Sequence, residues 1–258
     1  MFDKDMAVIA IPGFSDPMSA LTHLLGSAVF AIIGFLLVRK GRQVDAPGWN
    51  RRMTALAVFV FAAVAQLGIS GAYHILQPDL APRMVLQRID HAAIFFLIAA
   101  TFVPVHVILF KGWRRWLVLL ILLSLAGIGT TLKFLYFNEL PEIFGLTFYI
   151  AMGWVGAYSG YSLYHRYGWG FIRPLVWGGI AYTLGAVTEF LRQPVLLEGI
   201  IGPHELFHLA VLAGLGFHFR FTFAFAGRQL ELASLPVMNA DAIIGPARDI
   251  ASQTAQAE

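Results

Sequence analysis

The chain has 258 residues, of which 58% are hydrophobic and 13% charged, with a net charge of only +3. A soluble domain is usually about half apolar and about a quarter charged, so this composition excludes an ordinary soluble protein. Cysteine is absent, which excludes disulfides and thiolate metal sites and leaves His, Asp and Glu as possible ligands. The small charge gives no reason to expect a nucleic-acid partner.

Seven apolar runs are long enough to cross a membrane, which takes about twenty helical residues. They cover residues 18–38, 53–77, 88–110, 116–137, 143–164, 173–191 and 204–226. Backbone groups in lipid must bond within their own segment, so each run is expected to be a helix. The sequence therefore predicts an all-α integral membrane protein, a single bundle of seven transmembrane helices. The glycine pair Gly178 and Gly179 indicates close helix packing in the sixth run.

The segments outside the bundle are expected to differ in location. Of the 18 Lys and Arg residues, 13 would lie on the side of the C-terminus and five on the other. Positive charge favours the cytoplasmic side, so we predict an external segment at 1–17 and a disordered cytoplasmic tail at 227–258. The first residues lack the pattern of a cleavable signal peptide.

Four polar clusters interrupt the ends of the apolar runs, where ionisable side chains are costly and indicate function. Odd-numbered helices start on the N-terminal side of the membrane and even-numbered helices end there, so all four clusters should lie near one face. The clusters are Asp16, Ser19, Thr22 and His23; Ser70 and His74; Arg88, Asp90 and His91; and His204, Glu205 and His208.

The spacing of these residues predicts a metal site. His204 and His208 are four residues apart, so both imidazoles project from one face of a helix and can share a metal. His74 as a third ligand would leave a fourth tetrahedral position for water, as in catalytic zinc sites. Asp90, expected at the start of the third helix, and Ser70 could then bind or orient that water.

Other histidines are weaker candidates. His23 and His91 lie at helix ends, where an imidazole is often merely interfacial, although either could join the metal site. For His106, His165 and His218, a surface or packing role is expected.

Two further interpretations remain open. Residues 204–208 read H-E-x-x-H, the zincin signature, in which Glu205 would be the general base of an intramembrane metalloprotease; under the three-histidine interpretation, Glu205 simply faces the aqueous loop. Alternatively, the metal could be structural in a receptor or pore, with Asp90 filling the fourth position.

Taken together, these segments resemble the haemolysin III family, the bacterial branch of the progestin and adipoQ receptor (PAQR) proteins. DPMSALTH from Asp16 to His23 resembles the family motif E-P-x-N-x-x-T-H, with Asp for Glu and Ser19 for Asn. The run from Ser70 to His74 matches S-x-x-x-H, and DHAAIFFLIAATFVP resembles the third-helix motif. GGIAYTLGA and HELFHLAVLAG are similar to the sixth and seventh helices.

This resemblance implies a seven-helix fold with zinc (Zn²⁺) held by His74, His204 and His208. Asp90 would act on the water, with Ser70 beside it. Kinship with adiponectin receptors and, more distantly, alkaline ceramidases implies hydrolysis of a lipid amide or ester, with a membrane lipid as substrate. The haemolysin name implies membrane permeabilisation instead. We expect a multi-pass protein of the bacterial inner (plasma) membrane.

Overall fold

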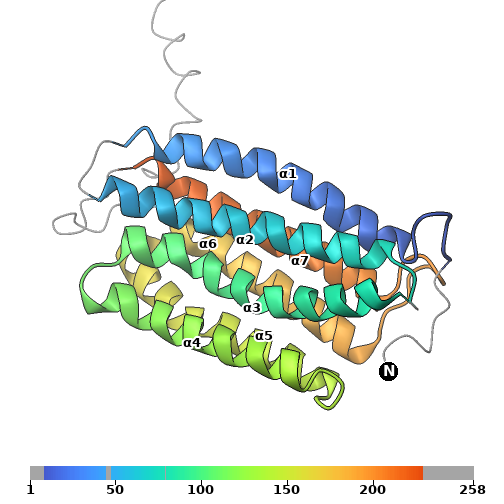
Figure 1. Cartoon of the computed structure of the whole chain (residues 1–258). Coiled ribbons are helices and arrows are strands. Elements are labelled where there is room, and N and C mark those ends of the chain that lie inside the picture. The colour runs from blue at the N-terminus through green and yellow to red at the C-terminus, as the bar shows by residue number, and fades with distance from the viewer. Residues whose placement is uncertain (1–8, 45–47, 79, 229–258) are drawn as a thin grey trace, which may run out of the picture.

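The computed structural model describes residues 9–44, 48–78 and 80–228. This part of the chain contains seven α-helices and no strand longer than an isolated bridge (Figure 1). The helices are α1 (Pro17–Gly41), α2 (Trp49–Ile75), α3 (Ala81–Leu109), α4 (Trp113–Leu135), α5 (Glu142–Trp154), α6 (Gly156–Leu191) and α7 (Pro203–Ala226). The predicted all-α membrane bundle is confirmed. The predicted tail lies outside the described residues from 229 onward.

Five of these helices, α1 to α4 and α7, are long and apolar enough to cross a membrane. The predicted fifth crossing is divided, because α5 has only 13 residues and α6 begins two residues after it ends. Within the 36 residues of α6, Gly168 adopts φ 75° and ψ 175°, which interrupts the helix. Leu175 packs beside Gly160 across this interruption. The count of seven crossings stays a prediction.

Helix α3 starts earlier than predicted, and this changes the position of the candidate residue Asp90 within the helix. The helix begins at Ala81, before the predicted start at residue 88, because Pro82 is accommodated in its first turn. The sequence prediction had placed Pro82 in the connection between the runs 53–77 and 88–110. Asp90 therefore lies in the third turn of α3, not at its start, and its side chain is buried.

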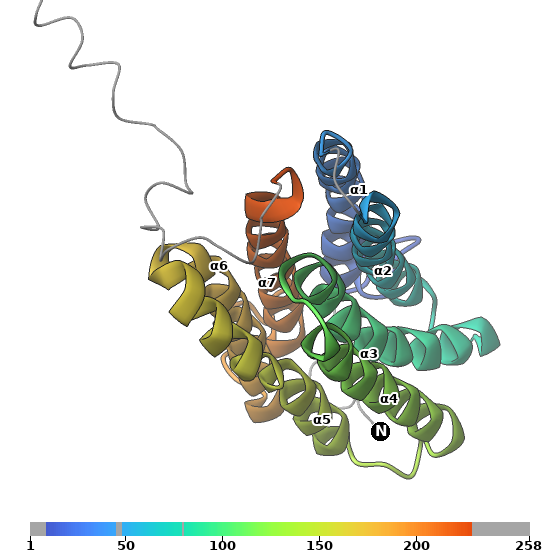
Figure 2. The same cartoon turned by 90° about the vertical axis from the view of Figure 1, so that its left-hand side faces the viewer.

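The helices form two groups that meet along α7. Helices α1 to α4 pack in chain order, α6 packs along α7, and α7 closes the bundle against α1 (Figure 2). Aromatic side chains of α7, including Phe219 and Phe225, pack in the core with Phe30 and Phe59. Large apolar side chains are exposed on the outside, as lipid contact requires.

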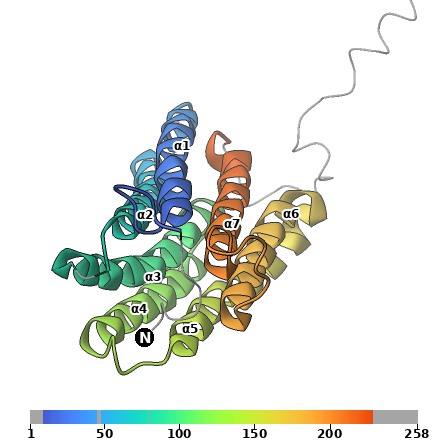
Figure 3. The same ribbon diagram turned by 90° about the vertical axis from the view of Figure 1, so that its right-hand side faces the viewer.

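A cavity of about 1750 Å³ lies inside the bundle, with α3, α5, α6 and α7 providing most of its walls. Along α3 its lining runs from Arg83 to Val105, which is about 33 Å at 1.5 Å per helical residue. Figure 3 views the bundle from the end where α1, α3 and α7 begin. The candidate metal centre lies at this end.

Candidate metal centre

Three histidines from two helices meet at one end of the cavity. His74 comes from the last turn of α2, and His204 and His208 come from the start of α7. One ring nitrogen of each lies within 4.8 Å of the others, and His74 and His208 are buried while His204 is half-buried. The grouping predicted from the sequence is therefore present, and the group could hold a metal ion.

Two of these rings are oriented by carboxylates. Asp16 Oδ2 lies 2.9 Å from Nδ1 of His74, and Glu189 Oε1 lies 3.2 Å from Nδ1 of His204. An ionised carboxylate only accepts, so both Nδ1 atoms carry the hydrogen. In the neutral rings, the Nε2 lone pairs remain available as metal ligands. Carboxylate–histidine pairs of this kind are typical of metal sites, where they fix the ring and raise its basicity.

The spacing of the two Nε2 atoms fits a zinc ion. They lie 3.3 Å apart. With both hydrogens on Nδ1, two lone pairs face each other at this distance, and either a proton on one Nε2 or a metal ion between them relieves the repulsion. Two tetrahedral Zn–N bonds of about 2.0–2.1 Å place their nitrogens about 3.3 Å apart. The donor set and its spacing therefore fit zinc, although another imidazole-binding metal would satisfy the same donors.

Asp16, which directly precedes α1, belongs to a wider hydrogen-bond network. Its Oδ2 also accepts a hydrogen bond of 2.9 Å from Nη2 of Arg83. Arg83 in turn donates to the carbonyl of Leu76 and lies over the ring of Tyr73, 4.7 Å from its centroid. Burial would raise the pKa of Asp16, but the hydrogen bond from His74 and the nearby positive charges outweigh it and hold the pKa below its usual value. Asp16 is thus kept ionised behind His74.

His23 lies against the centre without joining the group of three. Its ring stacks on that of His208, with centroids 3.7 Å apart and an interplanar angle of 7°. The side chain is buried, and neither ring nitrogen has a hydrogen-bond partner among the described residues. Stacking limits the rotation of the His208 ring, so His23 can position a ligand.

Glu205 has a structural role. Its Oε1 accepts from Oγ of Ser19 at 2.9 Å, and its Oε2 accepts from the backbone N–H of Gly202 at 2.9 Å. The side chain is buried, so the expectation that it faces an aqueous loop is wrong. Both oxygens tie α7 to α1 and to the preceding loop. This arrangement gives no support to Glu205 as the general base of a protease.

Asp90 is held beside the centre by a residue that was not among the predicted site residues. Gln66 of α2 donates from Nε2 to Asp90 Oδ1 at 2.9 Å, and both side chains are buried. Ser70, one turn further along α2, is also buried, lies on the cavity wall and interacts with Asp90. A glutamine in the middle of an apolar run was a usable signal, because polar side chains in lipid need partners. Glu189, an ionisable residue within the apolar run 173–191, could have been found in the same way.

The remaining histidines are dispersed. His91 lines the cavity, but it lies outside the group of three. His165 is exposed, as expected. His218 is buried on the cavity wall, and His106 is buried in a hydrogen bond with Ser159.

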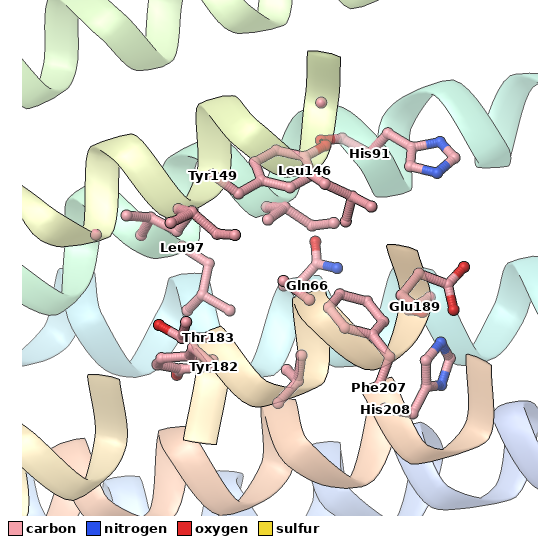
Figure 4. Close-up of a pocket in the computed structure, with 18 of the residues that line it drawn as sticks. Gln66, His91, Leu97, Leu146, Tyr149, Tyr182, Thr183, Glu189, Phe207 and His208 are labelled. Atoms are coloured by element: carbon pink, nitrogen blue, oxygen red, sulfur yellow. The ribbon is translucent and has the colours of Figure 1, made fainter. Parts of the chain in front are cut away.

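The cavity beside the centre combines a few polar groups with apolar walls. In the view of Figure 4, Glu189 and His208 lie on one side, and the amide of Gln66 lies between Leu146 and Phe207. An apolar cavity with a few convergent polar groups is the usual form of a small-molecule site.

Comparison with known proteins agrees with the sequence motifs. Residues 14–219 match the family described as haemolysin-III related. Hemolysin-3 of Bacillus cereus is 35% identical over 127 residues, which are 49% of this chain and 54% of the relative. A Hemolysin-3 homolog of Bacillus subtilis (strain 168) is 31% identical over 130 residues, 50% of this chain and 58% of that protein. The chain thus aligns with little more than half of the length of each. The family match covers the helices that build the centre, and the chain belongs to the haemolysin III family.

Proposed function

We propose that the protein is a zinc-dependent membrane hydrolase that cleaves an amide or ester bond of a lipid. The observation that carries this proposal is the pair of carboxylate-oriented histidines with nitrogens 3.3 Å apart at the end of a large cavity. Three histidines would leave a fourth tetrahedral position open, as in catalytic zinc sites.

The residues around the centre suit this chemistry. Zinc, when bound by the three histidines, would polarise a carbonyl group and make hydroxide available near neutral pH. Asp90 would take up the proton released in the reaction, and Gln66 would hold its carboxylate in place. Ser70 would help to orient the polar end of the substrate. The apolar cavity walls would hold an acyl chain and keep bulk water away.

The first test is the metal content of purified protein. Wild type should contain close to one zinc per chain, and the double variant His204→Ala, His208→Ala should contain almost none, measured by elemental analysis in detergent. Folded wild type without any metal, even after exposure to zinc, would rule out the proposed chemistry.

A second test separates catalysis from metal binding. Asp90→Asn should lower the rate of hydrolysis of an N-acyl or O-acyl lipid by about 10²–10⁴-fold, because a proton acceptor is lost. Zinc content should stay near the wild-type value, because Asp90 lies outside the group of three histidines. Unchanged hydrolysis in this variant would contradict the role given to Asp90.

A second candidate function is membrane permeabilisation, with the metal in a structural role. The relatives are named Hemolysin-3, and the cavity lining follows α3 for about 33 Å, close to the thickness of a hydrocarbon core. Release of a trapped dye from vesicles tests this function. Equal release by wild type and Asp90→Asn would show that any permeabilisation does not depend on hydrolysis.

A further inference from the structure

A second polar site lies at the opposite end of the cavity from the histidine group. His106 of α3 and Ser159 of α6 are both buried, and Nε2 of His106 lies 2.9 Å from Oγ of Ser159. Along α3, His106 is 16 residues from Asp90, which corresponds to about 24 Å. The two sites therefore do not share side chains.

The ring of His106 is held in one orientation. Its Nδ1 lies 3.3 Å from the carbonyl oxygen of Arg114. A carbonyl only accepts, so Nδ1 carries the hydrogen and Nε2 presents a lone pair. The ring also stacks on Phe110, with centroids 4.5 Å apart and planes at 16°, and contacts Phe102 less closely. The hydroxyl of Ser159 therefore donates to Nε2.

Ser159 lies where a ligand can reach it. It is part of the cavity wall, whereas His106 lies behind it, outside the lining. Gly156, one turn earlier on α6, packs directly against Phe102, so the backbone of α6 approaches α3 closely enough for the hydrogen bond. Gly160 also lines the cavity and leaves space next to the hydroxyl.

This arrangement has the parts of an activated serine. A hydroxyl, a neutral imidazole within hydrogen-bond reach, and a third group that orients the imidazole are the recurring elements of nucleophilic catalysis. In this protein, the carbonyl of Arg114 stands in the place that a carboxylate takes in a triad.

We propose that Ser159, with His106 as its base, is a nucleophile that accepts the acyl group of an acyl ester in the cavity. Oγ of Ser159 attacks the carbonyl carbon while its proton passes to Nε2 of His106. The bond from the carbonyl carbon to the leaving oxygen then breaks, and that oxygen takes the proton from His106 as the alcohol departs. An O-acyl serine results, and water attacks it by the same route to release the fatty acid.

An alkyl fluorophosphonate tests the site directly, since an activated serine displaces fluoride and forms a stable O–P bond. Full-length protein in detergent should gain one adduct by intact mass, and peptide mapping should place it on Ser159. Because the adduct is located in the wild-type protein, this result does not depend on the folding of any variant. Ser159→Ala should lose the adduct, and His106→Gln should react about 10²–10⁴-fold more slowly because the base is lost.

Matched controls distinguish this site from the metal centre. Ser162→Ala removes a hydroxyl three residues away that donates to the carbonyl of Tyr158, and it should react like wild type. Metal-stripped wild type should do the same, whether or not the zinc proposal holds. Folded wild type that forms no adduct, or an adduct mapped to another serine, would overturn the proposal.

Discussion

Asp16 shows how a motif residue acquires a physical role at the scale of one side chain. In the sequence it replaces the glutamate of a family motif, and its partner could not be inferred. In the structure, its carboxylate accepts from His74 Nδ1 at 2.9 Å and from Arg83 at 2.9 Å. Asp16 is therefore expected to contribute to the affinity of the site for its metal.

Replacing Asp16 with Asn should weaken zinc binding by about 10–100-fold, the usual effect of removing a group that orients a histidine ligand. Competition with a zinc-chelating dye measures the dissociation constant. Glu139→Gln is the matched control, because Glu139 is an exposed carboxylate in the connection between α4 and α5. Equal affinities in the two variants would show that Asp16 does not support the site.

His23 allows the role of a ring to be separated from that of its nitrogens. If stacking on His208 is what matters, His23→Phe should keep the zinc affinity of wild type. His23→Ala should weaken zinc binding by about 2–10-fold, which corresponds to the interaction energy of one aromatic pair. Isothermal titration of metal-free protein gives both numbers. A loss in His23→Phe as large as in His23→Ala would indicate that a nitrogen of His23 is needed.

At the scale of helices, two neighbouring glycines have different surroundings. The sequence predicted close packing for both. A Cβ atom on Gly178 would lie 2.7 Å from His218 Cδ2 and 3.2 Å from the carbonyl oxygen of Gly214, whereas one on Gly179 would meet nothing within 4 Å. Of these two glycines, Gly178 allows the close approach of α6 and α7, and the prediction for Gly179 was wrong.

Alanine at these positions should have opposite effects. Gly178→Ala should lower the free energy of unfolding by about 1–3 kcal/mol through overpacking. Gly179→Ala should be neutral or stabilise by up to about 1 kcal/mol, because alanine favours the helix. Thermal unfolding in one detergent compares the variants. A larger loss in Gly179→Ala would contradict the packing described for α6 and α7.

For the whole molecule, the orientation in the membrane rests on the distribution of basic residues. Because the chain has no cysteine, single cysteines report on it without further engineering. Asn138→Cys, on the side of the metal centre, should react with a membrane-impermeant maleimide on intact cells. Gln43→Cys, in the connection between α1 and α2, should react only after permeabilisation. The reverse pattern would place the centre on the cytoplasmic side.

Much of the architecture follows from the sequence because lipid imposes local rules. The long apolar runs predicted helices, and the spacing of His204 and His208 put two ligands on one face. The ends of helices were less well predicted, since Pro82 fits either a loop or the first turn of α3. The division of the fifth crossing between α5 and α6 also left no clear mark in the apolar pattern.

The sequence by itself determined the class of protein, the apolar segments and the three histidines. Only the tertiary structure decided which side chains meet across helices: Asp16 with His74, Gln66 with Asp90, and His106 with Ser159. These pairs are 24 to 58 residues apart, and Ser19 and Glu205 are 186 apart. Helical periodicity places a residue on a face of its own helix, but the rotation and depth of the neighbouring helix decide its partner, and these depend on packing throughout the bundle.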